Sequence, residues 1–307
     1  MHTVFIDGSS GTTGLRIRER LAARRDVTLL ELAAEVRKDP AARQDAMARA
    51  DVAFLCLPDG AARESAALAA DLDTVLLDTS TAHRTDPAWA YGFPELPGQR
   101  SRLAAARRIA NPGCHASGFI ALAAPLVAAG LVAPDAALTC FSLTGYSGGG
   151  KPMIAAYEAA PADLLFRGGR QYGLSQAHKH LPEMLAFTGL RRAPVFCPVV
   201  VPDYAGMEVT VPLFREQLRG TLHDLWEVYD AWYAGPVIRF CHGADEAGFL
   251  SSAKYAGRDG MEIGVYGNEE RILLTARYDN LGKGASGAAI QNMNLVFGMD
   301  ETTGLRL

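Results

Sequence analysis

A glycine-rich stretch, GSSGTTG, occupies positions 8 to 14 between an apolar run and a helical segment. The run TVFIDG has the composition of a buried strand, and an Arg/Glu/Ala-rich stretch from Leu15 to Arg25 follows the glycines. Glycines let the backbone turn tightly and approach a pyrophosphate, which then lies at a helix N-terminus where amides and the helix dipole favour an anion. The spacing G-x-x-G-x-x-G is a variant of the dinucleotide fingerprint, and the strand–helix context gives it weight. We therefore predict a dinucleotide-binding loop formed by Gly8, Ser9, Ser10, Gly11, Thr12, Thr13 and Gly14.

Strand-like and helical segments alternate after this loop, with further strand candidates at Val27–Leu32, Asp51–Pro58 and Thr74–Asp78. The alternation predicts βαβ units and a parallel sheet, hence a Rossmann-type α/β domain. The loops LPDG and DTSTAHR follow two of these strands and should lie at the sheet edge that carries the glycine loop, where ligands bind. Pro58 and Ser80 are therefore candidate cofactor contacts, and Arg84 is a candidate anion-binding residue. A solvated loop is the alternative for each.

The residues leave the choice between NAD and NADP open. Glu31 lies near the end of the second predicted strand, where an acid holds a free ribose 2′-hydroxyl. Arg37 and Lys38 follow closely and suit a 2′-phosphate.

The chain has 307 residues and a net charge of −4, with charges of both signs along its length. This length suits one large domain or two of medium size, and the lack of a basic cluster argues against nucleic-acid binding. The N-terminal residues do not resemble a signal peptide, and no apolar run approaches the ~20 residues of a membrane span. Five cysteines without regular spacing fit a reduced compartment. We expect a cytoplasmic protein.

The stretch NPGCHASG, positions 111 to 118, places Cys114 between a turn signal and a long apolar run that indicates a helix. A thiol at a helix N-terminus has a lowered pKa, because the helix dipole favours the thiolate. The other cysteines lie in strand-like apolar runs and are expected in the core: Cys56, Cys140, Cys197 and Cys241. Cys114 is therefore the candidate nucleophile.

A nucleophilic thiol needs a base, and the segment YGLSQAHKHLPEM supplies candidates. Pro182 suits the first turn of a short helix that ends near Gly189. His180 should then precede this helix, and Glu183 should lie in its first turn. We interpret His180 as the base and Glu183 as the group that orients its imidazole.

The remaining histidines of this region receive no catalytic role. His178 is expected to be a surface or hydrogen-bonded residue. His115 is adjacent to Cys114 in sequence, so its ring is not expected to reach the same substrate atom. A metal site is disfavoured, because spacings such as C-x-x-C and H-E-x-x-H do not occur.

The stretch GYSGGGKP, positions 145 to 152, matches the beginning of a P-loop. The next residue should be Ser or Thr to hold magnesium, and here it is Pro152, which argues against a nucleoside triphosphatase. The turn can still receive a substrate phosphate through backbone amides. The candidates are Ser147, Gly148, Gly149, Gly150 and Lys151.

From Pro194 to Arg277 several strand-like runs surround one helical stretch, which indicates a separate α+β domain. Ser286 is then expected to cap a final helix with one apolar stripe, formed by Ile290, Met293 and Phe297. Gln291, Asn292 and Asn294 lie on its other faces. An Asn that points into a cofactor crevice can bind the nicotinamide carboxamide, and a solvated amide is the alternative.

The chain resembles the N-acetyl-γ-glutamyl-phosphate reductase family, shorter-chain type, over nearly its full length. The resemblance rests on motifs in family order: GSSGTTG, FLCLPDGAARE, DTSTAHR, YGFPEL, NPGC, GYSGGGK, HKHLPE and KGASGAAIQNMNL. The family is related to aspartate-semialdehyde and glyceraldehyde-3-phosphate dehydrogenases and pairs a Rossmann domain with an α+β catalytic and oligomerisation domain. The resemblance implies an NADP-binding domain of residues 1–112 and 286–307 and a catalytic domain of residues 113–285. One departure is HAS after the cysteine, where many relatives carry Tyr-Pro-Thr or a similar run.

The resemblance further implies NADPH as cofactor and Cys114 and His180 as catalytic residues. It places Tyr172 and Glu183 in supporting positions and Asn292 near the nicotinamide. The implied reaction reduces N-acetyl-γ-glutamyl phosphate to N-acetyl-glutamate 5-semialdehyde and phosphate through a cysteine thioester, in arginine biosynthesis, within a homodimer or homotetramer. The alternatives are a sibling enzyme for aspartyl or carrier-bound aminoadipyl phosphate, and a non-catalytic NADP-binding sensor with Cys114 as a redox switch.

Overall fold

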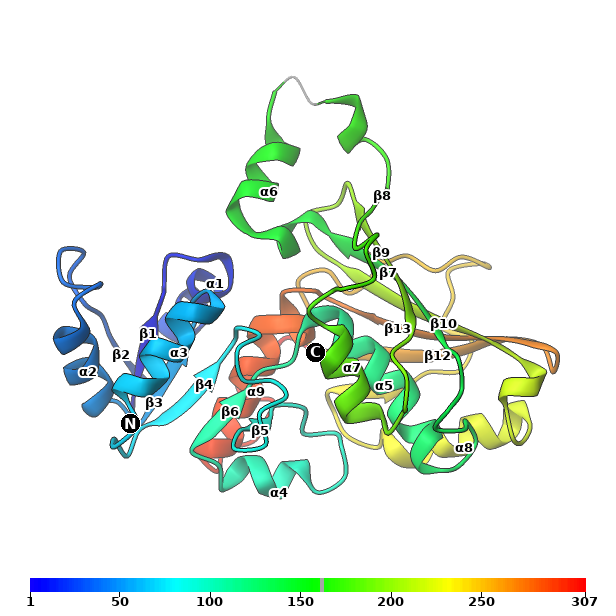
Figure 1. Ribbon diagram of the computed structural model, residues 1–307, viewed down its shortest axis with the longest axis horizontal. Coiled ribbons are helices and arrows are strands. Elements are labelled where there is room, and N and C mark those ends of the chain that lie inside the picture. The colour runs from blue at the N-terminus through cyan, green and yellow to red at the C-terminus, as the bar shows by residue number, and fades with distance from the viewer. Residues whose placement is uncertain (161–162) are drawn as a thin grey trace. The chain divides into compact units, whose positions relative to one another are not determined.

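The structure is a computed structural model that describes residues 1–160 and 163–307 (Figure 1). Within these residues the chain divides into two compact units. The first contains Met1–Pro112 and Ala285–Leu305, and the second contains Gly113–Gly284 and Arg306–Leu307.

The first unit is a parallel sheet with helices on both faces. Its strands pair in the order β2-β1-β3-β4-β6-β5, and every pairing is parallel. The strands are β1 (His2–Asp7), β2 (Val27–Leu30), β3 (Val52–Leu55), β4 (Val75–Asp78), β5 (Ala90–Tyr91) and β6 (Arg108–Ala110). The helices are α1 (Thr12–Ala22), α2 (Pro40–Ala48), α3 (Asp59–Leu68), α4 (Gln99–Ala104) and α9 (Gly287–Val296). This arrangement confirms the predicted Rossmann-type class.

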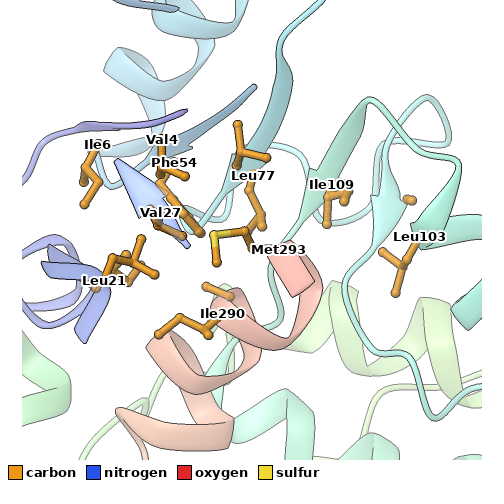
Figure 2. Close-up of a cluster of buried hydrophobic side chains, with 14 residues drawn as sticks. Val4, Ile6, Leu21, Val27, Phe54, Leu77, Leu103, Ile109, Ile290 and Met293 are labelled. Atoms are coloured by element: carbon orange, nitrogen blue, oxygen red, sulfur yellow. The ribbon is translucent and has the colours of Figure 1, made fainter. Parts of the chain in front are cut away.

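The C-terminal helix α9 packs into the core of this first unit, although it is far in sequence from the unit's other elements. Figure 2 shows Ile290 and Met293 of α9 beside Val4 and Leu77 of the sheet, with Leu21 of α1 in the same cluster. Helices α2 and α3 contribute to a second cluster on the sheet's opposite face, which contains Met47 of α2 and Phe5 of β1. Both faces of the strands are therefore buried, which explains why their sequences are continuous apolar runs.

The second unit is a mixed sheet with strand order β11-β12-β13-β10-β7-β9-β8. The strands are β7 (Thr139–Gly145), β8 (Arg170–Gln171), β9 (Val195–Val201), β10 (Met207–Phe214), β11 (Ile238–Phe240), β12 (Met261–Gly267) and β13 (Arg271–Tyr278). The helices are α5 (Cys114–Ala128), α6 (Gly150–Glu158), α7 (Leu181–Thr188) and α8 (Leu222–Trp232). Short helical turns occur at Tyr146–Gly149, Leu164–Phe166, Arg215–Gln217 and Gly282–Ser286. The predicted α+β class of this part is confirmed.

Helices α5 and α8 pack on one face of the second sheet, and α7 packs on α5 (Figure 1). Helix α5 packs against β10 and β13 and against α7, and all of its residues from His115 to Leu126 are buried. The strands alternate between this covered face and an outer face, as in the pattern of β10, whose even-numbered residues are the more exposed. A nearly all-apolar helix therefore leads from Cys114 into the centre of the unit.

Two sequence expectations need correction, those for Ser286 and for the cysteines. Ser286 makes no side-chain cap, because a π-helical turn, Gly282–Ser286, already precedes α9 and holds Ser286 in helical conformation. Arg306 and Leu307 lie with the second unit, because Arg306 exchanges hydrogen bonds with Asp259. Of the cysteines expected in the core, Cys140 is fully buried, whereas the other three are half-buried.

None of the helices in residues 1–160 and 163–307 is long and apolar enough to cross a membrane.

Candidate active site

Cys114 is the first residue of helix α5, as the sequence predicted. The preceding Gly113 is the N-cap residue in extended conformation, and Cys114 is half-buried. No acidic side chain lies in the first turn of α5. The sulfur therefore lies at the positive end of a helix dipole, which favours the thiolate form.

Glu183 holds the turn that leads into Cys114. It lies in the first turn of α7, is 1% exposed, and its Oε1 accepts the backbone N–H of Gly113 at 2.6 Å. A charged acceptor makes this hydrogen bond stronger than a neutral one. The sequence suggested a role in orienting His180; the structure gives this carboxylate a direct link to the start of α5.

Two residues that the sequence analysis missed also fix Cys114. The hydroxyl of Tyr278 donates to the carbonyl oxygen of Cys114 (2.5 Å) and accepts the N–H of Gly118 (3.1 Å). Gly284 lies against the nucleophile, since a Cβ built on it would be 2.9 Å from Cys114 Cβ. Neither residue carries a local sequence signal for this role, because both come from segments more than 150 residues away from Cys114.

His180 is the N-cap residue of α7 and is buried, which matches its predicted place just before this helix. Its backbone N–H donates to Nδ1 of His178 at 3.1 Å, so His178 is hydrogen-bonded as expected. The rings of His178 and His180 lie 4.7 Å apart between centroids, and each lies within 6 Å of the ring of His115. The structure thus gathers three imidazoles beside the start of α5.

His115, which received no role from the sequence, lies at the centre of a buried hydrogen-bond chain. Its Nδ1 is 2.7 Å from Ser142 Oγ, and its Nε2 is 2.6 Å from Tyr172 Oη. Burial, with the charge of His178, lowers the pKa of His115 to about 3. Ser142 offered one signal for this chain, because a polar residue at a buried, alternate position of an apolar strand needs a partner.

Tyr172 directly follows β8, and its phenol is hydrogen-bonded to His115, the residue after Cys114. Burial, and then the charge of the Cys114 thiolate, raise the pKa of its phenol well above the ordinary value. The phenol therefore stays protonated, and it can donate a hydrogen bond to an anion that forms at Cys114.

The glycine-rich segment after β7 is a 3₁₀ turn followed by helix α6, a helix that the sequence analysis did not assign. Ser147 is buried, and its Oγ accepts a hydrogen bond from Asn280 at 3.0 Å. Gly148 adjoins the same Asn280 side chain, and Gly149 packs against Met153. Lys151 is exposed in the first turn of α6. The segment therefore presents a helix N-terminus and a lysine.

A cavity of about 300 Å³ opens beside the glycine loop of the first unit. Its lining includes Gly8, Ser9 and Ser10, together with Arg18, Glu31, Arg37 and Lys38. Arg18 donates to Glu31 at 3.2 Å, and this pairing lowers the pKa of Glu31. The cavity thus joins the glycine loop with the residues on which the choice between NAD and NADP depends.

Glycine is required at the turn of this loop. Gly8 has φ +87°, and a Cβ on it would lie 2.3 Å from the carbonyl oxygen of Cys56. The carbonyl oxygen of Gly8 accepts the N–H of Gly11, the N-cap residue of α1, and Thr12 and Thr13 begin that helix. A Cβ on Gly14 would in turn lie 2.5 Å from Gly8 O. The geometry is that of a strand–turn–helix cradle for a phosphate group.

The other predicted residues of the first unit lie in loops at the ends of strands. Pro58 is the N-cap residue of α3. Ser80 is buried, and its N–H and hydroxyl both donate to Asp78 at 2.8 Å. Arg84 is buried and donates to the carbonyl oxygens of Asn111 and Thr79. Arg84 therefore joins the loop after β4 to the loop after β6. These bonds give no support to its predicted role in phosphate binding.

Asn292 is fully buried in α9 of the same unit, so it is not a solvated amide. Its Nδ2 donates to the carbonyl oxygen of Gly92 (3.0 Å) and to Asn111 Oδ1 (3.2 Å). Its Oδ1 has no hydrogen-bond partner among the described residues. A buried acceptor without a donor costs free energy, and a bound amide can supply that donor.

In the part of the chain that the structure describes, no group of three His, Cys, Asp or Glu side chains has a geometry that could hold a metal ion.

Comparison with known proteins identifies the family to which the two units belong. Residues 3–105 match the family described as semialdehyde dehydrogenase, NAD binding domain, and residues 114–280 match semialdehyde dehydrogenase, dimerisation domain. The N-acetyl-γ-glutamyl-phosphate reductase of Brucella ovis is 45% identical over 305 residues, which cover 96% of this chain and 98% of that protein. This chain belongs to the N-acetyl-γ-glutamyl-phosphate reductase family. A member from Chelativorans sp. is also 45% identical, over 95% of this chain and 97% of its own length.

Solved structures show that the family shares its fold with aspartate semialdehyde dehydrogenases. Aspartate semialdehyde dehydrogenase II of Vibrio cholerae has a TM-score of 0.72 at 18% identity, covering 97% of this chain and 99% of that one. The Candida albicans enzyme, solved with NADP, has a TM-score of 0.69 at 15% identity over 97% and 98% of the two chains. The 45% identity to N-acetyl-γ-glutamyl-phosphate reductases confirms the resemblance that the motifs indicated.

Proposed function

We propose that this chain reduces N-acetyl-γ-glutamyl phosphate to N-acetyl-glutamate 5-semialdehyde and phosphate with NADPH, in arginine biosynthesis. One observation carries the proposal. Cys114 begins a buried helix, Glu183 holds the turn before it, and Tyr172 is hydrogen-bonded to the adjacent His115, in a chain 45% identical to reductases of that name. We assign NADP(H) binding to the first unit, and catalysis and oligomerisation to the second.

The residues of the first unit fit NADP(H). The glycine cradle with its serine and threonine hydroxyls suits the pyrophosphate. Arg18, Arg37 and Lys38 line the adjoining cavity and suit a 2′-phosphate, and Glu31 is already paired with Arg18. Pro58 and Ser80 shape the neighbouring loops, and Asn292 Oδ1 offers an acceptor for the nicotinamide carboxamide. When bound, NADPH supplies the hydride that reduces the acyl group.

The first chemical step forms a thioester on Cys114. The thiolate attacks the carbonyl carbon of the acyl phosphate, and a C–S bond forms while the carbonyl oxygen takes up the negative charge. When that oxyanion collapses, the bond from carbon to the phosphate oxygen breaks and phosphate leaves. Lys151, the hydroxyl of Ser147 and the amides of Gly148 and Gly149 are the proposed donors for the leaving phosphate.

The second step needs a proton donor and then a base. After hydride addition to the thioester carbon, His180 protonates the hemithioacetal oxyanion. His180 next removes that proton as the carbonyl reforms, and the C–S bond breaks to release the semialdehyde and the Cys114 thiolate. Tyr172 donates a hydrogen bond to the oxyanion in both steps. A thiol suits this sequence because it is a strong nucleophile and a good leaving group.

We also propose a homodimer formed through the outer face of the second sheet. Among the described residues, helices pack on the opposite face, and exposed apolar side chains lie on strands of the sheet: Phe141, Val195, Phe214 and Leu273. The match to a family described as a dimerisation domain supports a second copy of this chain as the partner. Phe141→Glu with Leu273→Glu should yield monomers in sedimentation analysis, whereas Leu15→Glu, on a similarly exposed leucine of the first unit, should not. A wild-type protein that sediments as a monomer would contradict the proposal.

The five cysteines are free thiols, which supports a reduced compartment, and we propose the cytoplasm.

Phosphate dependence tests the proposed reaction in reverse. Purified protein, NADP and N-acetylglutamate semialdehyde are mixed with and without inorganic phosphate, and NADPH formation is followed by absorbance. The proposal expects rapid formation only with phosphate, and little formation with aspartate semialdehyde. An equal rate without phosphate would exclude an acyl-phosphate reductase, and a preference for aspartate semialdehyde would favour the sibling enzyme.

A further inference from the structure

Three side chains from distant segments form a continuous hydrogen-bond chain through His115, the residue that follows Cys114. Ser142 lies on β7 and is 0% exposed, and His115 lies in the first turn of α5 and is 2% exposed. Ser142 Oγ is 2.7 Å from His115 Nδ1, and His115 Nε2 is 2.6 Å from Tyr172 Oη. Tyr172, which is half-buried, is the member of the chain closest to solvent.

The surroundings of His115 keep its ring neutral. The ionisable groups that face it are Tyr172, His178 and His180, and the ring of Phe196 covers it at 5.2 Å between centroids. No carboxylate is among these ring neighbours in the described part of the chain. Burial and the charge of His178 both disfavour protonation and lower the pKa of His115 to about 3. A neutral imidazole has one N–H, so it donates from one nitrogen and accepts at the other.

The serine decides which nitrogen carries the proton. In residues 1–160 and 163–307, the hydroxyl of Ser142 has one hydrogen-bond partner, His115 Nδ1. If Nδ1 carried the proton, the Ser142 hydroxyl would be a buried donor with no acceptor, which is costly. Ser142 therefore donates to Nδ1, the imidazole proton lies on Nε2, and Nε2–H donates to the phenolic oxygen of Tyr172. The O–H proton of Tyr172 is then left to be donated to a different acceptor.

We propose that Ser142 and His115 form a positioning relay that makes Tyr172 a hydrogen-bond donor towards Cys114. In the resting protein the charge of Cys114 acts on the Tyr172 phenol, and we assign the Cys114 thiolate as the acceptor. In the reaction, the acceptor is the oxyanion on the carbon bound to that sulfur. His115 touches neither substrate nor cofactor in this scheme; it acts through Tyr172.

The role in the oxyanion step rests on the proposed reductase function, whereas the effect on the thiolate does not. A hydrogen bond to the charged form of an acid lowers its pKa. The relay therefore lowers the pKa of Cys114, and this property can be measured without any substrate. Failure of the relay and failure of the proposed reaction are in this way separable.

The first experiment measures the alkylation rate of Cys114 by iodoacetamide from pH 5 to pH 10, quantified by mass spectrometry of the peptide that contains Cys114. The variants are Ser142→Ala, His115→Phe and Tyr172→Phe. Cys140→Ala is the matched control, because Cys140 lies two residues from Ser142 on the same buried face of β7. We expect each relay variant to raise the pKa of Cys114 by about one unit, since one hydrogen bond to the thiolate is lost. The control should leave that pKa unchanged.

The second experiment measures kcat for the reductase reaction. Tyr172→Phe should lower kcat by about 10²-fold, the usual effect of losing one oxyanion donor. His115→Phe and Ser142→Ala should each lower kcat with little change in KM. In the Tyr172→Phe background, His115→Phe should cost nothing further, because His115 acts only through Tyr172. A residue with a merely structural role would give additive losses.

The outcomes separate the two ideas. If the pKa of Cys114 rises in the relay variants of a protein without reductase activity, the relay stands and the proposed reaction fails. If the reaction is present but Ser142→Ala and His115→Phe leave both the pKa of Cys114 and kcat at wild-type values, the relay is wrong. Additive losses in the double variant would also overturn it. Should His115→Phe fail to fold, Ser142→Ala removes only one buried oxygen and decides the question alone.

Discussion

The substitution Gly284→Ala tests how tightly the nucleophile is held. An added Cβ would lie 2.9 Å from Cys114 Cβ, 3.1 Å from the carbonyl oxygen of Asp279 and 3.4 Å from Cys114 Cα. Carbon atoms pack best at about 3.5–4.0 Å, so Cys114 has to move by roughly 0.6–1 Å. The contacts are with the backbone and with the first side-chain atom, which cannot rotate out of the way. The new methyl group therefore pushes directly on the start of α5.

Stability and catalysis should respond to this change to different degrees. Gly284 lies in a π-helical turn, and alanine in a helical position gains about 1 kcal/mol over glycine. Overpacking a buried contact costs about 1–3 kcal/mol. The net loss of unfolding free energy is then about 0–2 kcal/mol. A displacement of a reacting atom by about 1 Å can cost 10²-fold in rate, so we expect kcat to fall by about that factor.

The assay compares kcat, NADPH affinity and the thermal midpoint of Gly284→Ala with those of Gly235→Ala. Gly235 is the matched control, because a Cβ there would meet no described atom within 4 Å. Gly235→Ala should be indistinguishable from wild type, and Gly284→Ala should bind NADPH normally while losing turnover. A kcat for Gly284→Ala within twofold of wild type would refute the reasoning that the position of Cys114 limits the rate.

Three further predictions address the cofactor loop, the turn before Cys114 and the buried imidazole. Gly8→Ala should weaken NADPH binding at least about 10-fold in a fluorescence titration, because its φ of +87° and the approach to Cys56 O exclude a Cβ, whereas Gly60→Ala should bind normally. Glu183→Gln should lower kcat by about 10-fold with a small change in KM, since Gly113 loses its charged acceptor; an unchanged kcat would exclude this anchoring role. His115 has a pKa of about 3 when folded against 6.5 in its unperturbed form, so its contribution to stability is present above pH 6.5 and is lost as the pH falls towards 3. Between pH 7 and pH 5 the unfolding free energy of the wild type should therefore fall by about 2 kcal/mol more than that of His115→Phe. The wild type should accordingly show the larger drop in thermal midpoint. Its ring NMR signal should not titrate above pH 5, and a signal that titrates near pH 6.5 would contradict the burial argument.

The elements that surround the chemistry were predictable because each carries a local signal. The helix at Cys114 follows an Asn-Pro-Gly turn, and the helix at Leu181 has Pro182 in its first turn and ends at Gly189. The strand before the glycine loop was likewise evident from its apolar run.

Other features depend on information that a short stretch of sequence does not contain. Helix α2 buries only three residues, so its apolar pattern is weak, although Asp39 caps it and Pro40 begins it. Helix α6 starts within a run of glycines that indicates a turn. The order of the second sheet joins β7 to β10 and β10 to β13, which are pairings between strands far apart in the chain. Such long-range partners are set by the packing of the whole unit.

The site shows the same division between local and long-range information. Cys114 and His180 follow from their positions at helix N-termini, which are local properties. The link from Glu183 to Gly113 and the contacts of His115 with Ser142 and Tyr172 join residues 27 to 70 positions apart. Sequence proximity to Cys114 argued against a role for His115, whereas the fold places its ring in a buried hydrogen-bond network.

The central claim is that Cys114 carries the acyl group as a thioester, and trapping that intermediate tests it most directly. The protein is incubated with N-acetyl-γ-glutamyl phosphate in the absence of NADPH, and its peptides are analysed by mass spectrometry. We predict one N-acetylglutamyl group per chain, on Cys114, that disappears when NADPH is added and never forms on Cys114→Ser. An acyl group on another residue, or a Cys114→Ser variant that turns over at nearly the wild-type rate, would contradict the account.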